Sequence, residues 1–455
     1  MNLIVIVADT CRQDHLGCYG NEWMHTENLD ALAEESVIFE SCYTASFPTV
    51  PHRADCFLGR YGFPCYGWGP LPRQWPTLAE TLTGAGYVTQ LIHDTPHFSR
   101  RGFNYERGFQ GWRWIRGQES DCEFTRANDS VEFEWSVDKD RYDEDLMPVH
   151  RLQRLDHPGE MGHHAPRVAM DACRWLEMNH KADRFFLWVD MFDPHEPWDA
   201  PDCFTELYFP GSPQGQKVRH PRYDFTDFLT PEELEWSHAA YCGELTLVDK
   251  WIGAILRKVG DLGLLEDTAI VFTSDHGFLL GEHGRIGKHA VQGGPWPLYE
   301  EVVRVPLLVR LPDGPRGDRK QQLVQPVDLC PTLLELAEVP VSRHVQGRSL
   351  VPILDGKPVR LREIAMSSGC IADRAHLSTR ATITHEEGWS LILGSLDQKP
   401  ELYYLPADPE QAEDRYEDDR LMALELAAMF RSALSFLGAE QAVVDQWKCL
   451  GGENG

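Results

Sequence analysis

Four short groups of residues in this 455-residue chain carry side chains suited to metal or oxyanion chemistry. Asp9 follows the apolar run Leu3–Ala8, and Asp275 with His276 follows the similar run Thr268–Thr273. Carboxylates and an imidazole that converge at strand ends are ligands for a divalent metal. An imidazole ligand argues against Ca²⁺, which takes oxygen ligands, and favours Mn²⁺ or Zn²⁺. We therefore expect Asp9, Asp275 and His276 to bind one divalent metal ion.

A hydroxyl and a guanidinium stand close together in the second group, Phe47–Arg53. If a helix begins at Pro51, Thr49 lies at its N-terminal end, where free backbone N–H groups and the helix dipole favour an anion. Arg53 can clamp oxyanion oxygens from the same turn. A plain helix entry explains the same spacing, because Thr-x-Pro is common there.

The other two groups are expected on loops. His195 lies between Pro194 and Pro197, and these prolines hold the backbone extended so that the imidazole is presented at the edge of a sheet. Lys288 follows Asp275 by thirteen residues, at the end of the glycine-rich segment 281–287. It can contact an anionic oxygen if the loop closes over the sheet, although a solvated lysine on a flexible loop fits equally well.

Apolar runs alternate with amphipathic helices along most of the chain, and this alternation indicates an α/β fold with a large, mostly parallel sheet. The predicted strands are Leu3–Ala8, Tyr87–Ile92, Phe185–Val189 and Thr268–Thr273. The predicted helices are Thr26–Glu35, Thr77–Ala85, Val168–Met178 and a capped helix from Thr230 to about Val259. Such sheets bind ligands at the carboxyl ends of their strands. Residues 115–165 and 199–229 are polar and irregular, so we expect long functional loops there.

The pattern changes after Val351 to short strands, Leu391–Gly394 and Leu402–Leu405, and a terminal helix from about Arg420 to Phe436. We therefore predict a catalytic α/β domain over residues 1–350 and a smaller C-terminal α+β domain over residues 351–455. With 43 basic and 71 acidic side chains the net charge is 43 − 71 = −28, which argues against nucleic-acid and anionic membrane partners.

The twelve cysteines are dilute and include no C-x-x-C pair, so reduced, structural thiols are expected. No stretch approaches the ~20 apolar residues of a membrane span. The first residues are too short an apolar run for a secretory signal. These observations predict a cytoplasmic protein.

The run from Ile6 to Gly20 resembles the opening of the sulfatase family, within the alkaline phosphatase superfamily. Further matches follow in the family's order at Glu27–Ala33, Asp193–Pro197, Ser274–Gly277, Gly281–Gly284, Gly287–Lys288, Arg304–Pro306, Gln325–Asp328, Val345–Leu350 and Glu401–Asp408. The resemblance implies a large α/β domain with a central mixed sheet, a smaller C-terminal sheet domain and one divalent metal. It also implies a nucleophile on the helix that begins at the family's Cys-x-Pro-x-Arg motif.

The nucleophile position departs from the family pattern. In most sulfatases its Cys, sometimes a Ser, is oxidised to formylglycine, but here the residue is Thr49, and Cys42 and Cys56 lie seven residues to either side. A formylglycine hydrate releases sulfate by breaking its own C–O bond, whereas a threonine adduct must be hydrolysed at sulfur or phosphorus. Relatives such as nucleotide phosphodiesterases and phosphoethanolamine transferases use threonine at this place. The chain thus resembles a sulfatase in scaffold and a phosphoryl-transfer enzyme in nucleophile.

Two more departures concern charge. Many sulfatases have a second acid directly after the first, but here Asp9 is followed by Thr10. The family's Gly-Lys-Trp-His is replaced by His93-Asp-Thr95-Pro-His97, so an anion-binding lysine is missing. The loss of this positive charge favours a singly charged substrate, such as a phosphodiester or phosphonate monoester. Phosphonate monoester hydrolases of the family also have a non-acid after the first Asp, although they keep the Cys.

Together, these residues and the resemblance predict a metal-dependent hydrolase with a phosphothreonine intermediate. The metal lies between Asp9, Asp275, His276 and the Thr49 oxygen, and Thr49 attacks phosphorus. Arg53 and Lys288 stabilise charge on the non-bridging oxygens, and His195 protonates the leaving oxygen. His97 and Thr95 bind the substrate, a small anionic ester.

Two alternatives remain open for this sequence. One is a sulfuric ester hydrolase that acts without formylglycine, and the other is a non-catalytic, anion-binding relative. The resemblance also allows a homo-oligomer.

Overall fold

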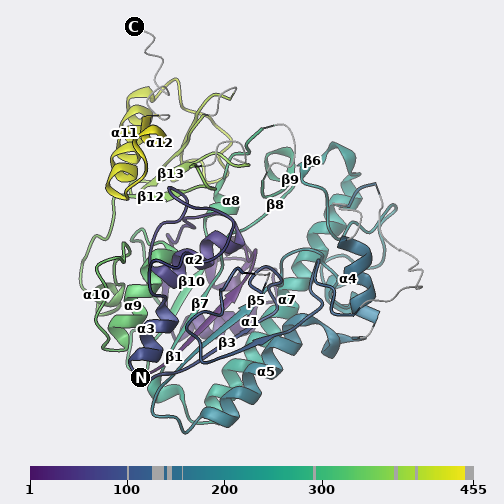
Figure 1. The fold of residues 1–455 in the computed structure, drawn as a ribbon. Coiled ribbons are helices and arrows are strands. Elements are labelled where there is room, and N and C mark those ends of the chain that lie inside the picture. The colour runs from purple at the N-terminus through teal and green to yellow at the C-terminus, as the bar shows by residue number, and fades with distance from the viewer. Residues whose placement is uncertain are drawn as a thin grey trace.

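A large mixed sheet forms the centre of the molecule (Figure 1). The computed structural model describes residues 1–99, 102–124, 138–140, 146–155, 157–289, 294–372, 378–394 and 398–445. In spatial order the strands are β11 (Asp318–Lys320), β2 (Val37–Phe39), β10 (Leu307–Arg310), β7 (Thr268–Thr273), β1 (Asn2–Ala8), β5 (Phe185–Met191), β3 (Val88–His93) and β4 (Gly111–Trp114). Strand β1 pairs in parallel with β5 and β7, while β10 runs antiparallel to both of its neighbours.

Helices cover both faces of this sheet, because its central strands are apolar on both sides. Along β1, Ile4 and Ile6 pack into the core cluster beneath α1 (Glu27–Glu34), α5 (His164–Asn179) and α7 (Pro231–Asp261). Leu3 and Val5 pack into the opposite cluster, with α2 (Thr49–Leu58), α3 (Leu78–Gly84), α9 (Leu329–Leu336) and α10 (Val351–Leu354). A sheet packed on both faces exposes only its strand ends to ligands.

A second, antiparallel sheet lies toward the C-terminus (Figure 1). It consists of β12 (Ile364–Ser367), β13 (Thr382–His385), β14 (Trp389–Ile392) and β15 (Glu401–Tyr404), and α11 (Arg420–Phe436) packs on it beside α12 (Gln441–Asp445). The backbone N–H of Phe47 donates to the carbonyl of Ser368 at 2.9 Å, and the N–H of Ser368 donates to the carbonyl of Ala45 at 2.9 Å. The C-terminal part thereby supports the segment that leads into α2.

The remaining elements are short. A three-stranded sheet is built from β6 (Asp224–Phe225), β9 (Arg285–Gly287) and β8 (Leu279–Leu280), and α8 (Glu300–Val303) precedes β10. The expected strands and helices are found with shifts of a few residues, and the α/β fold class is confirmed.

The expectation of two uninterrupted loops was wrong. Residues 115–165 contain α4 (Leu146–Leu155), and residues 199–229 contain α6 (Asp202–Thr205) and β6; residues 125–137, 141–145 and 156 lie outside the described part. Helix α4 is held by polar contacts, since Arg154 and His150 both lie 3.2 Å from the Asp199 carboxylate. The buried side chains described for this helix are polar, namely His150, Gln153 and Arg154, whereas Leu155 is exposed, so its apolar residues do not mark the face that packs.

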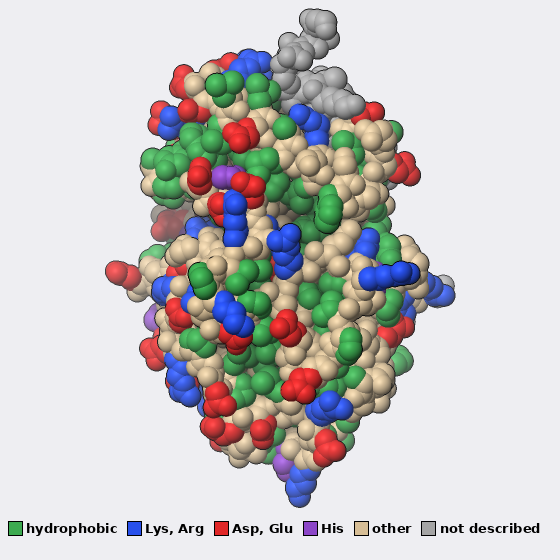
Figure 2. Space-filling model, turned by 90° about the vertical axis from the view of Figure 1, so that its left-hand side faces the viewer, with side chains coloured by type: hydrophobic (Ala, Val, Ile, Leu, Met, Phe, Trp, Pro, Cys, Tyr) green, Lys and Arg blue, Asp and Glu red, His purple; other side chains and the backbone are tan. Residues whose placement is uncertain are grey.

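The face of the molecule shown in Figure 2 carries charged side chains of both signs. On the face shown in Figure 2, acidic and basic side chains are interspersed, without a continuous basic surface. Among the residues that the structure describes, none of the helices has both the length and the apolar character needed to cross a bilayer.

Glu300 carries a buried carboxyl group, and this residue connects Tyr43 to Gln411 in the C-terminal part. It accepts a hydrogen bond from the Tyr43 hydroxyl at 3.0 Å, and its backbone N–H donates to Gln411. Burial raises the pKa of Glu300 to about 7. Its protonated form therefore stabilises the fold at low pH, and this contribution is lost as the pH rises from about 4.5 through 7.

We expect Glu300→Gln to be close to wild type at pH 4.5 and more stable than wild type above pH 7, by at most about 3 kcal/mol. Denaturant unfolding at both pH values measures the difference, with Glu301→Gln, a neighbouring and more accessible glutamate, as the control. An equal difference between Glu300→Gln and wild type at the two pH values would contradict the assignment.

Candidate active site

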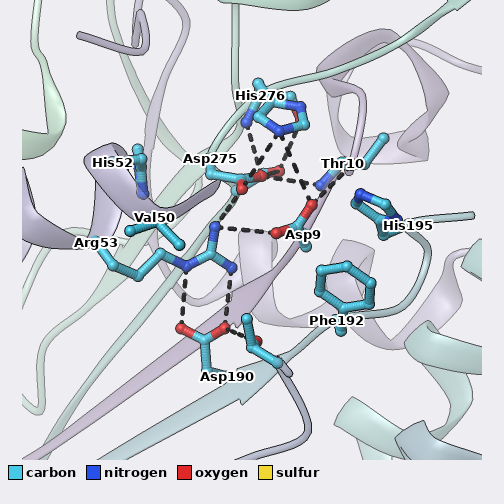
Figure 3. Close-up of polar contacts among 12 residues, drawn as sticks. Asp9, Thr10, Val50, His52, Arg53, Asp190, Phe192, His195, Asp275 and His276 are labelled. Carbon is cyan, nitrogen blue, oxygen red and sulfur yellow. Dashed lines mark hydrogen bonds and ion pairs between the residues drawn. The ribbon is translucent and has the colours of Figure 1, made fainter. Parts of the chain in front are cut away.

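Three buried carboxylates meet at the carboxyl ends of three neighbouring strands (Figure 3). Asp9 directly follows β1, Asp190 lies near the end of β5, and Asp275 comes two residues after β7. The register makes this inevitable, since Val7 of β1 pairs with Asp190 on one side and with Thr273 on the other. All three carboxylates are fully buried. Burying three negative charges requires nearby positive charge.

Arg53 supplies part of that charge from α2. Its guanidinium binds Asp190 through two nitrogens, Nη2 to Oδ1 at 2.9 Å and Nε to Oδ2 at 3.2 Å. Its Nη1 lies 3.1 Å from Oδ2 of Asp9 and also contacts Asp275. Asp190 is held in turn by hydrogen bonds from Trp188 Nε1 and the Thr95 hydroxyl, both at 2.9 Å. Arg53 is thus fixed in orientation by a fully buried network.

Asp9, Asp275 and His276 form a group of metal-ligating atoms that all lie within 4.8 Å of one another. The His276 Nδ1–H donates to the carbonyl of Gly277 at 2.9 Å, so its Nε2 presents a lone pair. That Nε2 lies 3.5 Å from Asp275 and 3.9 Å from Asp9, and it has no hydrogen-bond partner among the described residues. An oriented imidazole with two carboxylates fits a divalent metal.

The electrostatics of the two acids also suit a cation. Burial, and then the neighbouring Asp275, raise the pKa of Asp9 well above its ordinary value. Burial would raise the pKa of Asp275 too, but Arg53 and His276 outweigh burial and lower that pKa. Keeping two carboxylates this close ionised costs free energy unless a further positive charge is present. A divalent ion bound here would provide that charge.

The space around position 277, directly after His276, admits only a glycine. A Cβ at Gly277 would lie 1.9 Å from the backbone carbonyl oxygen of Glu301, which is shorter than any tolerable contact. The Gly277 backbone N–H donates to the carbonyl of Val302 at 2.9 Å. The close approach of these two backbones holds His276 against the sheet edge.

Thr10 and Lys288 join the same site from two loops. Thr10 has φ 59°, a left-handed conformation that is strained for a β-branched residue and typical of functional sites. Its hydroxyl donates to Asp9 at 2.7 Å and accepts from Lys288 Nζ at 3.3 Å, and its backbone N–H donates to Asp275 at 2.9 Å. Lys288 comes directly after β9, is buried, and lies 3.7 Å from Glu196.

His195 lies beside this centre and stacks on Phe192 with ring centroids 4.0 Å apart (Figure 3). Its Nδ1 donates to the carbonyl of Glu196 at 2.6 Å. Burial, together with Lys288, lowers the pKa of His195 well below its ordinary value, so the imidazole is neutral at pH 7. Phe192 also contacts His97 edge-on, with ring centroids 5.8 Å apart, and Nε2 of His97 is 3.5 Å from Glu119.

Helix α2 begins at Thr49, two residues earlier than predicted, after Pro48. Thr49 is buried and stands one turn before Arg53, so the two side chains leave the same face of the helix. Thr49 therefore shares the face of α2 from which Arg53 reaches the three carboxylates. Its roles as nucleophile and metal ligand stay predictions, as does substrate binding by His97 and Thr95.

Sequence reasoning missed three residues of this centre: Asp190, Thr10 and His52. Asp190 carried a usable signal, since it is the one charged residue in the apolar strand β5. Thr10 was considered only as the position at which many sulfatases have a second acid. His52 is fully buried beside Arg53, and burial and Arg53 lower its pKa to about 3.

The family model described as Sulfatase matches residues 1–339, and a model described as N-sulphoglucosamine sulphohydrolase, C-terminal, matches residues 281–436. An arylsulfatase from Clostridium perfringens is 27% identical over 383 residues, which cover 78% of each chain.

Solved structures that share the fold include the following two. The phosphonate monoester hydrolase of Agrobacterium radiobacter superposes with a TM-score of 0.74 at 21% identity and 96% coverage of each chain. A protein solved in complex with D-glucosamine-2-N,6-O-disulfate has a TM-score of 0.71 at 21% identity, covering 97% of this chain and 99% of its own.

If Asp9, Asp275 and His276 bind a metal ion, added metal should stabilise the folded protein. Mn²⁺, which prefers carboxylate ligands, should stabilise the wild type by about 2.7 kcal/mol at 100 times its dissociation constant, and Asp275→Asn should lose this increment. Chemical denaturation with and without added metal measures it. The control is Asp249→Asn, which removes a buried carboxylate bonded to Asn28 and Leu29, away from the site. It should lower stability but keep the increment; an undiminished increment in Asp275→Asn would refute the ligand assignment.

Proposed function

The chain belongs to the sulfatase family, and on this basis we propose that it is a metal-dependent hydrolase of phosphodiesters or phosphonate monoesters with Thr49 as its nucleophile. That it hydrolyses ester bonds follows from the family. The finer proposal is carried by one observation: a threonine opens α2, one turn before the arginine that contacts all three buried carboxylates.

The identity of that side chain limits the chemistry. A threonine adduct has no second hydroxyl on its Cβ, so it cannot release the transferred group by cleaving its own C–O bond. Water must attack the transferred group itself. Hydrolysis of a phosphorylated hydroxyl by water is ordinary enzyme chemistry, which favours phosphorus over sulfur as the centre of attack.

The charges of the site favour a singly charged substrate. Arg53 is shared among three carboxylates, and Lys288 lies beside Glu196. Little positive charge is therefore left to neutralise a dianion, even with a divalent ion bound by Asp9, Asp275 and His276. A phosphodiester or phosphonate monoester carries one negative charge at neutral pH, so a small ester of this class is the proposed substrate.

The proposed reaction uses the residues as follows. The Thr49 oxygen attacks phosphorus in line and loses its proton to solvent, while the bond to the leaving oxygen breaks. Arg53 and Lys288 hold the non-bridging oxygens, which gain charge in the transition state. A bound divalent cation, Mn²⁺ or Zn²⁺ in this proposal, supplies Lewis-acid stabilisation of the same charge. Water then hydrolyses the phosphothreonine.

His195 is proposed to deliver a proton to the leaving oxygen. Its Nδ1–H is committed to the Glu196 carbonyl, so the donated proton must sit on Nε2. The negative charge of a bound substrate favours protonation there, against the effects of burial and Lys288. Phe192 beneath the ring fixes its plane.

A second candidate function is sulfuric ester hydrolysis without formylglycine. The match to the Sulfatase model and the arylsulfatase relative favour it. A sulfate monoester also carries a single negative charge, so the electrostatics of the site suit it equally. The nucleophile is what separates the two candidates.

Substitution of Thr49 tests the proposal. Thr49→Ala should reduce turnover of bis-p-nitrophenyl phosphate or p-nitrophenyl phenylphosphonate by roughly 1000-fold or more, because no other hydroxyl replaces the nucleophile. Thr49→Ser, the matched control, keeps the hydroxyl and should retain measurable activity and accumulate a phosphorylated residue 49, detected by mass spectrometry. Wild-type turnover by Thr49→Ala would exclude Thr49 as the nucleophile, and turnover of p-nitrophenyl sulfate alone would favour the second candidate.

The role proposed for His195 can be tested by varying the basicity of the leaving group. His195→Gln should slow aryl phosphodiesters more strongly as the leaving phenol becomes more basic, by up to about 100-fold for the poorest leaving group. The reason is that p-nitrophenolate leaves without protonation, whereas a basic phenolate does not. The slope of rate against leaving-group pKa in variant and wild type measures this; parallel slopes would mean that His195 does not donate the proton.

A further inference from the structure

A second group of metal-ligating side chains lies outside the site described above, between the loop that follows β1 and helix α7. It consists of His15 on the loop and His238 and Cys242 on α7, with ligand atoms all within 4.8 Å of one another. We infer that His15, His238 and Cys242 bind a zinc ion that ties the loop carrying Asp9 and Thr10 to helix α7. This inference is independent of the reaction proposed for the chain.

The three side chains are placed by independent elements. His238 and Cys242 are four residues apart on α7, so they lie on one face of the helix. His15 comes from the short turn after β1, and its Nε2 lies 2.8 Å from Nε2 of His238. His15 and Cys242 are buried, while His238 is partly exposed. The group is therefore reachable by an ion from solvent through its His238 side.

The orientation of His15 is that of a metal ligand. Its Nδ1 lies 3.0 Å from the Asp14 carboxylate, which can only accept a hydrogen bond, so Nδ1 carries the proton. Nε2 therefore directs its lone pair toward His238. A carboxylate behind a ligating histidine is the usual partner that fixes its tautomer and increases its basicity. Asp14 itself is held by two hydrogen bonds from Arg12, at 2.9 and 2.6 Å.

Both imidazoles are available as neutral ligands. Burial, and then the nearby Arg12, lower the pKa of His15, while burial and His15 lower the pKa of His238 to about 4. Burial raises the pKa of the Cys242 thiol, so this side chain becomes a thiolate only when a cation replaces its proton. On binding, one S–H bond breaks, one sulfur–zinc bond forms, and the proton goes to solvent.

The donor set indicates the metal. Two imidazoles and one thiolate suit a borderline-soft ion, and Zn²⁺ accepts this set in tetrahedral geometry with one position left for water. Trp23 and Tyr241 pack edge-on against His15, with centroids 5.6 and 5.5 Å away, and shield it.

The site would act on the neighbouring catalytic loop. Between the two helical ligands, Tyr241 accepts a hydrogen bond from the Arg12 backbone N–H at 2.9 Å and donates to the Thr10 carbonyl at 3.0 Å. Thr10 in turn contacts both Asp9 and Lys288. A zinc ion at His15 and α7 therefore fixes the same loop at a second point.

Cobalt titration of the metal-stripped, full-length protein tests the site. Co²⁺ bound to Cys242 gives a thiolate-to-cobalt charge-transfer band, which the oxygen and nitrogen ligands of Asp9, Asp275 and His276 cannot produce. We expect the band in wild type, its retention in Asp275→Asn and in Cys330→Ser, which changes a buried thiol elsewhere, and its loss in Cys242→Ser. Added Zn²⁺ should remove the band from wild type.

Two further variants make the outcome decisive. Asp14→Asn should weaken cobalt affinity by roughly 10- to 100-fold while keeping the band at saturation. If Cys242→Ser does not fold, His238→Gln, at the partly exposed ligand, should weaken cobalt binding in the same titration. Absence of the band in wild type, its persistence in Cys242→Ser, or unchanged affinity in His238→Gln would overturn the inference.

Discussion

The burial of three carboxylates at adjacent strand ends is the constraint on which the rest of the site depends. Asp9, Asp190 and Asp275 are excluded from water, and Arg53 is bound to all three. Buried charges are tolerated only when they are paired and hydrogen-bonded. The bidentate contact with Asp190 commits the guanidinium, so Asp9 and Asp275 still need a cation. The metal requirement of the family is, in this chain, a requirement of charge balance.

The same balance explains how a protein with a net charge of −28 can bind an anion. Its overall field repels such a ligand, so affinity must arise locally, from the bound cation, Arg53, Lys288 and the N-terminal end of α2. Arg53, Lys288 and the first residues of α2 are buried, where electrostatic interactions are stronger than in water. Because the two side-chain cations are already paired with acids, we expect the site to bind a singly charged ester more readily than a dianion.

Much of the fold and part of the site could be predicted from local patterns. Strands such as β1 and β7 are continuous apolar runs, α7 has a capping box formed by Thr230 and Glu233, and both strands end at acids. Helix α4 was not predicted, because its described buried side chains are polar and its apolar residues do not mark the packed face. The pairing of Arg53 with Asp190 and of His15 with α7 depends on residues 137 and 223 positions apart, which only the register of the sheet and the packing of helices bring together.

The scaffold does not by itself decide between sulfur and phosphorus. Carboxylates, an imidazole, an arginine and a lysine stabilise charge on any tetrahedral oxyanion, so they are compatible with both. What distinguishes the two reactions is how the covalent intermediate breaks down, and this depends on one side chain. A gem-diol can expel sulfate without attack at sulfur, whereas an adduct on Thr49 would leave hydrolysis to water at the transferred atom. The substitution of one residue at the start of α2 therefore carries more information about the substrate than the rest of the site.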